Sequence, residues 1–153
     1  MADLKDRLRR DLTAAMKSRD TQRTSTLRMA LAAITNAEVS GKQSRELSDE
    51  EVEAVLGSEA KKRREAAEAF DGACRPELAQ KERDESQVLA EYLPAPLGAD
   101  EIVAIVTAAV ESTGSAGQGM RAMGQVMGLV QPQAKGRADG GVVAAEVKRQ
   151  LGA

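Results

Sequence analysis

Apolar residues recur at helical spacing from the beginning of the chain. Near the start, leucine or methionine stands at every fourth position: Leu4, Leu8, Leu12 and Met16. Charged residues fill many of the positions between them, so these apolar side chains share one face of a helix that we expect over residues 3–18. The same kind of spacing at Leu27, Leu31 and Ile34 predicts a second helix, which should end near Gly41 because glycine is a common C-terminal stop.

Two further helices are predicted before residue 93. Ser48 and Glu51 have the spacing of a capping box, and the neighbouring acidic residues suit the positive end of a helix dipole. The helix that they begin should be long and highly charged, and it should end near Gly72. Pro76 is acceptable in the first turn of the next helix, which we expect to continue to Tyr92.

Two prolines interrupt the helical pattern after Tyr92. Pro94 and Pro96 lie too close together for a continuous helix. We therefore predict one domain over residues 1–93 and a second over residues 94–153. No segment keeps the period-two alternation of a strand, so the sequence predicts an all-α protein in which a helical N-terminal domain is followed by a small three-helix C-terminal domain.

The three helices of the second domain differ in character. The first should be buried and lacks a clear polar face, the second carries a methionine stripe before Pro132, and the third ends the chain. Their apolar residues are Ile102, Val106, Ala109 and Val110 in the first, Met120, Met123, Met127 and Val130 in the second, and Val143, Val147 and Leu151 in the third. Because the methionines have helical spacing, we favour a core role for them over an adaptable partner surface.

The composition excludes several kinds of chemistry. The 153 residues include no His and a single Cys, so there is no His general base, no Ser-His-Asp or Cys-His pair and no thiolate zinc cluster. We expect no metal and no cofactor, and we expect Cys74 to be an ordinary half-buried thiol. The charged N-terminus is unlike a secretory signal, and the longest nearly apolar run is about half of the ~20 residues that span a bilayer. These features predict a soluble, cytoplasmic protein that does not enter a membrane.

Two basic segments are candidates for contact with phosphates. The run from Lys61 to Arg64 is the most basic, but acidic neighbours such as Glu59 partly neutralise it and favour a solvated helix face. Lys135 and Arg137 precede a predicted helix start, where free backbone amides favour anions. Asp139 could cap that helix and compete with a phosphate, so a capped structural turn is an equal alternative.

Several segments together resemble the GatB/YqeY family. They occur in the family's order and cover nearly the whole chain: Leu27 to Met29, Lys61 with Arg63 to Glu65, Tyr92 to Pro94, Met123 to Gly128, and Lys135 to Gly140. The resemblance implies an all-helical domain followed by a three-helix domain. It also implies a link to tRNA, because the corresponding tail of GatB, a subunit of glutamine-dependent tRNA amidotransferase, looks like the part that touches tRNA. Gln125 departs from the pattern, since family members often have Lys there, and a phosphate contact is lost.

Three functions follow from these observations. The first is a tRNA-binding or amidotransferase-accessory role, in which cations of the second domain contact phosphates: Arg121, Lys135, Arg137, Lys148 and Arg149. The second is a helical protein–protein interaction module with no RNA role. The third is an enzyme, which the family's link to carbon–nitrogen ligases with glutamine as amido-N-donor suggests. We disfavour standalone catalysis and predict no catalytic residue, because no nucleophile or phosphate loop accompanies carboxylates such as Glu59 and Glu65.

Overall fold

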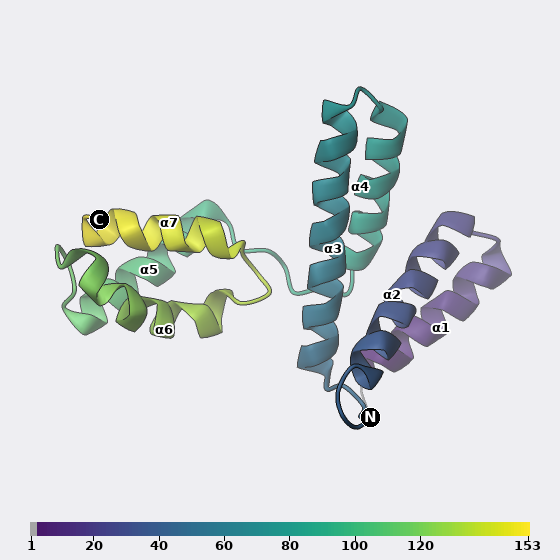
Figure 1. Cartoon of the computed structure of the whole chain (residues 1–153), viewed down its shortest axis with the longest axis horizontal. Helices are drawn as coiled ribbons and strands as arrows, with labels where there is room; N and C mark the ends of the chain where they lie inside the picture. Colours follow the sequence, from purple (N-terminus) through teal and green to yellow (C-terminus); the bar gives the residue numbers. More distant parts are fainter. Residues whose placement is uncertain (1–2) are drawn as a thin grey trace. The chain divides into compact units, whose positions relative to one another are not determined.

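The computed structural model describes residues 3–153, and every regular element in that range is a helix (Figure 1). The prediction of an all-α protein is therefore confirmed. The chain divides into two compact units, Met1–Leu93 and Pro94–Ala153. They are called here the N-terminal unit and the C-terminal unit.

The N-terminal unit consists of two helical hairpins (Figure 1). Its helices are α1 (Asp3–Ser18), α2 (Thr21–Val39), α3 (Asp49–Gly72) and α4 (Pro76–Ala90). α1 pairs with α2, α3 pairs with α4, and α2 also packs against both helices of the second hairpin. The predicted bounds of α1 and α3 are confirmed. α4 ends two residues earlier than expected, because the chain already turns at Glu91 and Tyr92.

Apolar residues from all four helices form the core of this unit. Ten buried side chains make up the cluster: Leu8, Leu27, Ala30, Ile34, Leu47, Val52, Leu56, Ala60, Leu89 and Tyr92. The predicted apolar face of α1 is only partly buried, because Leu8 is fully enclosed whereas Met16, at the end of the helix, is 42% exposed. Small alanines in the cluster let the helices approach closely, and Tyr92 is its only aromatic member.

The predicted capping box at the start of α3 is confirmed. The Glu51 amide donates to Ser48 Oγ at 3.3 Å, and the Ser48 amide donates to the Glu51 carboxylate at 2.9 Å. Arg45 adds two hydrogen bonds to the same carboxylate, at 2.8 and 2.5 Å. The Arg45 guanidinium, helped by the Ser48 amide, lowers the pKa of Glu51 to about 2.

Acid should weaken the beginning of α3. Because the folded-state pKa of Glu51, about 2, lies below its ordinary value of 4.5, the stabilisation is present above pH 4.5 and disappears as the pH falls from about 4.5 to about 2. The measurement is hydrogen exchange at the first amides of α3 over this pH range, in the wild type and in Glu51→Gln. The glutamine variant should show a smaller pH dependence, and identical curves for the two proteins would contradict the assignment.

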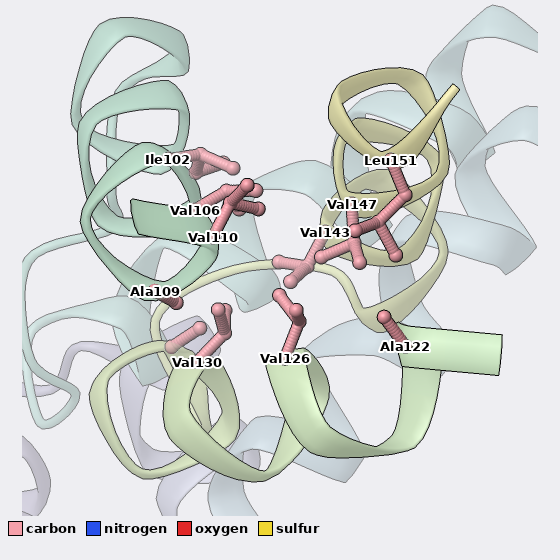
Figure 2. Packing of buried hydrophobic residues seen from close by; sticks show 11 residues of the cluster. Ile102, Val106, Ala109, Val110, Ala122, Val126, Val130, Val143, Val147 and Leu151 are labelled. Carbon is pink, nitrogen blue, oxygen red and sulfur yellow. The ribbon is translucent and has the colours of Figure 1, made fainter. Parts of the chain in front are cut away.

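The C-terminal unit contains three α-helices and one short 3₁₀ helix in the described residues. They are α5 (Ala99–Thr113), η1 (Gly119–Ala122), α6 (Met123–Ala134) and α7 (Gly140–Leu151). Valine and alanine dominate its core, which Figure 2 shows at close range. The buried members are Ile102, Val106, Ala109, Val110, Ala122, Val126, Val130, Ala134, Val143, Val147 and Leu151. The buried residues predicted for the first and third helices of this domain are all among them.

The expected burial of the first of these helices, α5, is only half right. Ile102, Val106 and Val110 face the core, but Val103 is 38% exposed and Ala104 is also exposed. α5 packs against α6 and α7 on one face only, and no element of the C-terminal unit covers the other face. An apolar sequence without a polar face therefore does not establish burial on all sides.

The methionine stripe was predicted to belong to the core of the C-terminal unit, and this prediction is wrong. α6 faces the core through Val126 and Val130, whereas Met120 is 57% exposed and Met123 and Met127 are only partly buried. Val126 and Val130 point from α6 into the core (Figure 2). Met123 and Met127 pack against this core and are only partly buried.

α6 continues past Pro132 to Ala134. Pro132 is exposed and stands in the last turn of α6. A proline there removes only one intrahelical hydrogen bond, and its ring lies on the solvent side of the helix, so the last turn survives.

Candidate nucleic-acid interface on the C-terminal unit

The five predicted cations of the C-terminal unit all lie between the start of η1 and the end of α7, on three segments. Arg121 is on η1, Lys135 and Arg137 are in the connection between α6 and α7, and Lys148 and Arg149 are near the end of α7. η1 packs against α7. Figure 1 shows the start of α6 and the end of α7 at the same end of this unit. The cations therefore form two groups at opposite ends of α7, a 12-residue helix about 18 Å long.

Charge is separated between the helices of this unit. Over residues 94–153 five basic and five acidic side chains balance each other. α5, however, carries three of the acidic residues, Asp100, Glu101 and Glu111, and no basic one. All five basic residues belong to the segment from η1 to α7, whose only acidic residues are Asp139 and Glu146. A neutral unit thus has an acidic helix and a basic half.

Asp139 occupies the backbone amides that had been considered for a phosphate. Its Oδ1 accepts hydrogen bonds from the amides of Gly141 at 2.8 Å and Val142 at 3.3 Å. This carboxylate is the N-cap of α7, and an anion at that place would have to displace it. The alternative of a capped structural turn is confirmed, and any phosphate contact here depends on side chains.

Arg149 is committed to a partner on its own helix. Its guanidinium donates two hydrogen bonds to Glu146, at 2.9 and 2.6 Å, and Gln150 donates a third to the same carboxylate at 2.8 Å. The hydrogen bonds from Arg149 and then Gln150 lower the pKa of Glu146 to about 2. Glu146 is therefore ionised at neutral pH, and it offsets most of the positive charge that Arg149 would offer to a ligand.

Arg137 has a structural role that the sequence did not reveal. Its Nε donates to the carbonyl of Ala95 at 3.1 Å, and its own carbonyl accepts the amide of Leu97 at 2.7 Å. Leu97 in turn packs against the core of the C-terminal unit. Arg137 thus holds the segment before α5 against the connection between α6 and α7, while its two terminal nitrogens make no hydrogen bond within residues 3–153.

The other three cations are the most available to a ligand. Arg121, Lys135 and Lys148 are exposed, and within the described part of the chain their side chains make no ion pair or hydrogen bond. Arg121 and Lys148 belong to the cation group at the end of α7, and Lys135 belongs to the group at its beginning. The predicted set of five thus contains three free cations, one partly engaged arginine and one neutralised arginine.

The basic run from Lys61 to Arg64 in the N-terminal unit is only partly exposed to solvent. Lys61, Lys62 and Arg64 are exposed as predicted, but Arg63 is 4% exposed, and for this residue the prediction was wrong. Arg63 Nη1 donates to the carbonyl oxygen and the carboxylate of Glu59, both at 3.1 Å. Arg63 Nε lies 3.3 Å from Oε2 of Glu85 on α4, without hydrogen-bond geometry. This arginine joins α3 to α4, so its charge serves the fold.

Glu59 and Glu65, the carboxylates considered for catalysis, do not form an acid–base pair with each other. Burial alone would raise the pKa of Glu59, but hydrogen bonds from Lys62 and Arg63 outweigh it and lower this pKa. Glu59 is therefore an ionised partner of two cations at neutral pH. Glu65 is exposed on the surface of α3.

Tyr92, in another of the family-like segments, belongs to a polar network at the end of α4. Its hydroxyl donates to Asp11 and accepts from Arg23 at 3.2 Å, and Arg23 also pairs with Glu91. Arg7 lies over the ring, 4.8 Å from its centroid. Burial and then the hydrogen bond to Asp11 raise the pKa of Tyr92 to about 12. This tyrosine ties α1 and α2 to the end of α4.

The position of Cys74 differs from the half-buried one that was predicted. It is exposed at the turn between α3 and α4 and has a positive φ of 57°. The expected half-buried position was wrong, because the chain reverses direction at this turn and leaves the side chain outside the helical core.

Each helix of residues 3–153 is too short or too polar to span a bilayer. Within the same range, no group of three or more His, Cys, Asp or Glu side chains is placed to hold a metal ion.

Comparison with known proteins gives two findings. A family model described as "Yqey-like protein" matches residues 5–151, which span both units. A curated relative from Pyrenophora tritici-repentis (strain Pt-1C-BFP), "Altered inheritance of mitochondria protein 41, mitochondrial", is 32% identical over 151 residues. The match covers 96% of this chain and 80% of the relative. The name of that relative assigns it to mitochondria. The cytoplasmic localisation of this chain therefore stays a prediction. The family match runs through nearly the whole chain, and the protein belongs to the YqeY-like family.

Proposed function

We propose that this protein binds RNA, with tRNA as the ligand, through the basic half of its C-terminal unit. The observation that carries the proposal is the separation of charge: every cation of this unit lies between η1 and α7, and three of its five carboxylates lie on α5. Such a surface orients a polyanion toward one half of a unit that has no net charge. The resemblance to a subunit of tRNA amidotransferase selects tRNA among RNAs, in a binding or accessory role.

Phosphates would be contacted by side chains of unequal availability. Arg121, Lys135 and Lys148 are free to pair with them. Arg137 would add its two terminal nitrogens, which can bind a phosphate in bidentate fashion while Nε keeps its bond to Ala95. Arg149 would contribute little while Glu146 holds it. The proposal thus predicts about three to four phosphate contacts, each releasing a counterion on binding.

The dependence of tRNA binding on salt tests this function. Affinity measured by fluorescence anisotropy at several salt concentrations should fall linearly on a double logarithmic plot, with a slope of about −3 for three to four phosphate contacts. A slope near zero, or no binding at low salt, would contradict the proposal. The same measurement with a polyanion that is not a nucleic acid, such as heparin, shows how much of the binding is general attraction of negative charge.

Removing the carboxylate of Glu146 should strengthen RNA binding. Glu146→Gln frees Arg149 and deletes one negative charge from the basic half. One additional phosphate contact is worth roughly eightfold in affinity at about 0.1 M salt, and the slope of the salt plot should become steeper by about one.

The matched control for this prediction is Glu111→Gln. It removes the same charge from the exposed surface of α5, which the proposed interface does not include. An equal gain in both variants would show that only the net charge matters, and no gain in Glu146→Gln would show that Arg149 does not approach the RNA.

The alternative function, a helical protein–protein interaction module, is favoured by a different observation. The C-terminal unit exposes four large apolar side chains in addition to its cations: Val103, Met120, Leu129 and Val142. Recovery of a stoichiometric protein partner after nuclease treatment, together with absent RNA binding, would support this function over the first one.

A further inference from the structure

We infer that the RNA bound by the C-terminal unit is base-paired, and that it is contacted through its phosphates at both ends of α7. This inference rests on the proposed function and specifies the class of RNA. It follows from three features of the unit: the absence of aromatic residues, helix N-termini that disfavour anions, and the placement of its cations in two separate groups.

The C-terminal unit has little with which to hold an unpaired base. Proteins that bind single strands stack successive bases on aromatic side chains. The only aromatic residues of the chain, Phe70 and Tyr92, belong to the N-terminal unit. An arginine can also stack on a base. Arg137, however, donates a hydrogen bond to the Ala95 carbonyl, and Arg149 forms an ion pair with Glu146. Among the described residues, Arg121 is the one arginine of the unit that is free to stack. The stacking that makes single strands good ligands is therefore nearly absent.

The helix N-termini of the unit are poor sites for phosphates. Asp139 accepts the amides of Gly141 and Val142 at the start of α7. The first turn of α5 contains Asp100 and Glu101, whose negative charges oppose an anion there. α6 continues directly from η1, and the Met123 amide at its start donates to Met120. Backbone anion sites are thus disfavoured, and binding depends mainly on side-chain charge. Affinity then follows the density of phosphates, which is higher along a duplex than along a single strand.

The placement of the cations also favours a rigid ligand. Arg121 and Lys148 lie at the end of α7, and Lys135 lies at its beginning, while α6 between them carries no charged side chain. A ligand that engages both groups must reach from one end of α7 to the other, and a 12-residue helix is about 18 Å long. A duplex holds phosphates at such a separation without further ordering, whereas a flexible strand loses conformational freedom when it is fixed at two points.

The experiment compares a 20-base-pair RNA duplex with one of its strands, chosen without self-complementarity, at the same salt. For three contacts, the larger counterion release from a duplex alone predicts roughly fourfold tighter binding at about 0.1 M salt. A second duplex with a scrambled sequence should bind equally well, because no base is read. Single strands that bind as tightly as the duplex, or a strong preference between the two duplexes, would overturn the inference.

Two sets of variants test the bridging of the two groups. Lys135→Ala removes the free cation at the beginning of α7, and Arg121→Ala with Lys148→Ala removes those at its end. Either change should weaken duplex binding more than single-strand binding, and equal effects on both ligands would overturn the inference. If the wild type binds tRNA in a salt-dependent way but binds duplex and single strand equally well, the inference is refuted and the proposed function stands. Absence of binding to all three RNAs would refute the proposed function with it.

Discussion

Replacing Arg63 with Ala is expected to destabilise the N-terminal unit by about 3–5 kcal/mol, because removal of one member of a buried ion pair leaves the other charge uncompensated. Glu85 is 5% exposed, and its one ion-pair partner within residues 3–153 is Arg63. The change would also remove the two hydrogen bonds from Arg63 to Glu59. Urea denaturation of the wild type and the variant measures the difference in the free energy of unfolding.

Two controls separate the lost charge from the lost side-chain volume. Lys61→Ala removes an exposed cation from the same helix and should change stability by no more than about 0.5 kcal/mol. Arg63→Met with Glu85→Leu replaces both charges by apolar groups of similar size, and should recover a large part of the loss because no buried charge remains. An Arg63→Ala variant as stable as Lys61→Ala would contradict the assignment of this pair to the fold.

The largest expected effect on binding comes from reversing the three free cations of the C-terminal unit. Arg121→Glu, Lys135→Glu and Lys148→Glu together should lower tRNA affinity by at least a few hundredfold at about 0.1 M salt, since each lost contact is worth roughly eightfold. Arg137 is left unchanged in this variant because it also holds the segment around Ala95. Binding isotherms of the two proteins at one salt concentration measure the effect.

The matched control changes the net charge by the same amount on the other unit. Lys42, Lys61 and Lys81 are exposed residues of the N-terminal unit, and their replacement by Glu should lower affinity far less. Comparable losses in the two triple variants would show that RNA responds to the charge of the whole protein, and would exclude the basic half as a defined interface.

Local signals in the sequence were sufficient for most of the helices. Ser48 and Glu51 lie three residues apart, so their reciprocal hydrogen bonds could be expected from spacing alone. The ends of helices were less certain: α4 ends at Ala90 and not at Tyr92, because local spacing does not show where the chain begins to turn. The orientation of α6 was missed because both the methionines and the valines have helical spacing, and packing against two other helices decides between them.

The sequence shows which cations the candidate site contains, but it shows less well which of them are free to bind a ligand. The five cations were proposed from the sequence, and their role stays a prediction. The pairing of Arg149 with Glu146 had a signal, because three-residue spacing brings opposite charges together on a helix. The bond from Arg137 to Ala95 joins residues 42 positions apart, and the ion pair of Arg63 with Glu85 joins two helices. Neither contact follows from periodicity, because each depends on how the chain folds back on itself.

The single tyrosine of this protein is also a built-in optical reporter. With no Trp in the chain, near-ultraviolet emission comes almost entirely from Tyr92, whose hydroxyl donates to the Asp11 carboxylate in the folded N-terminal unit. Loss of this hydrogen bond on unfolding should change the emission intensity. The C-terminal unit has no fluorophore of its own, so the melting of the two units can be separated in one unlabelled sample by comparing emission with far-ultraviolet circular dichroism.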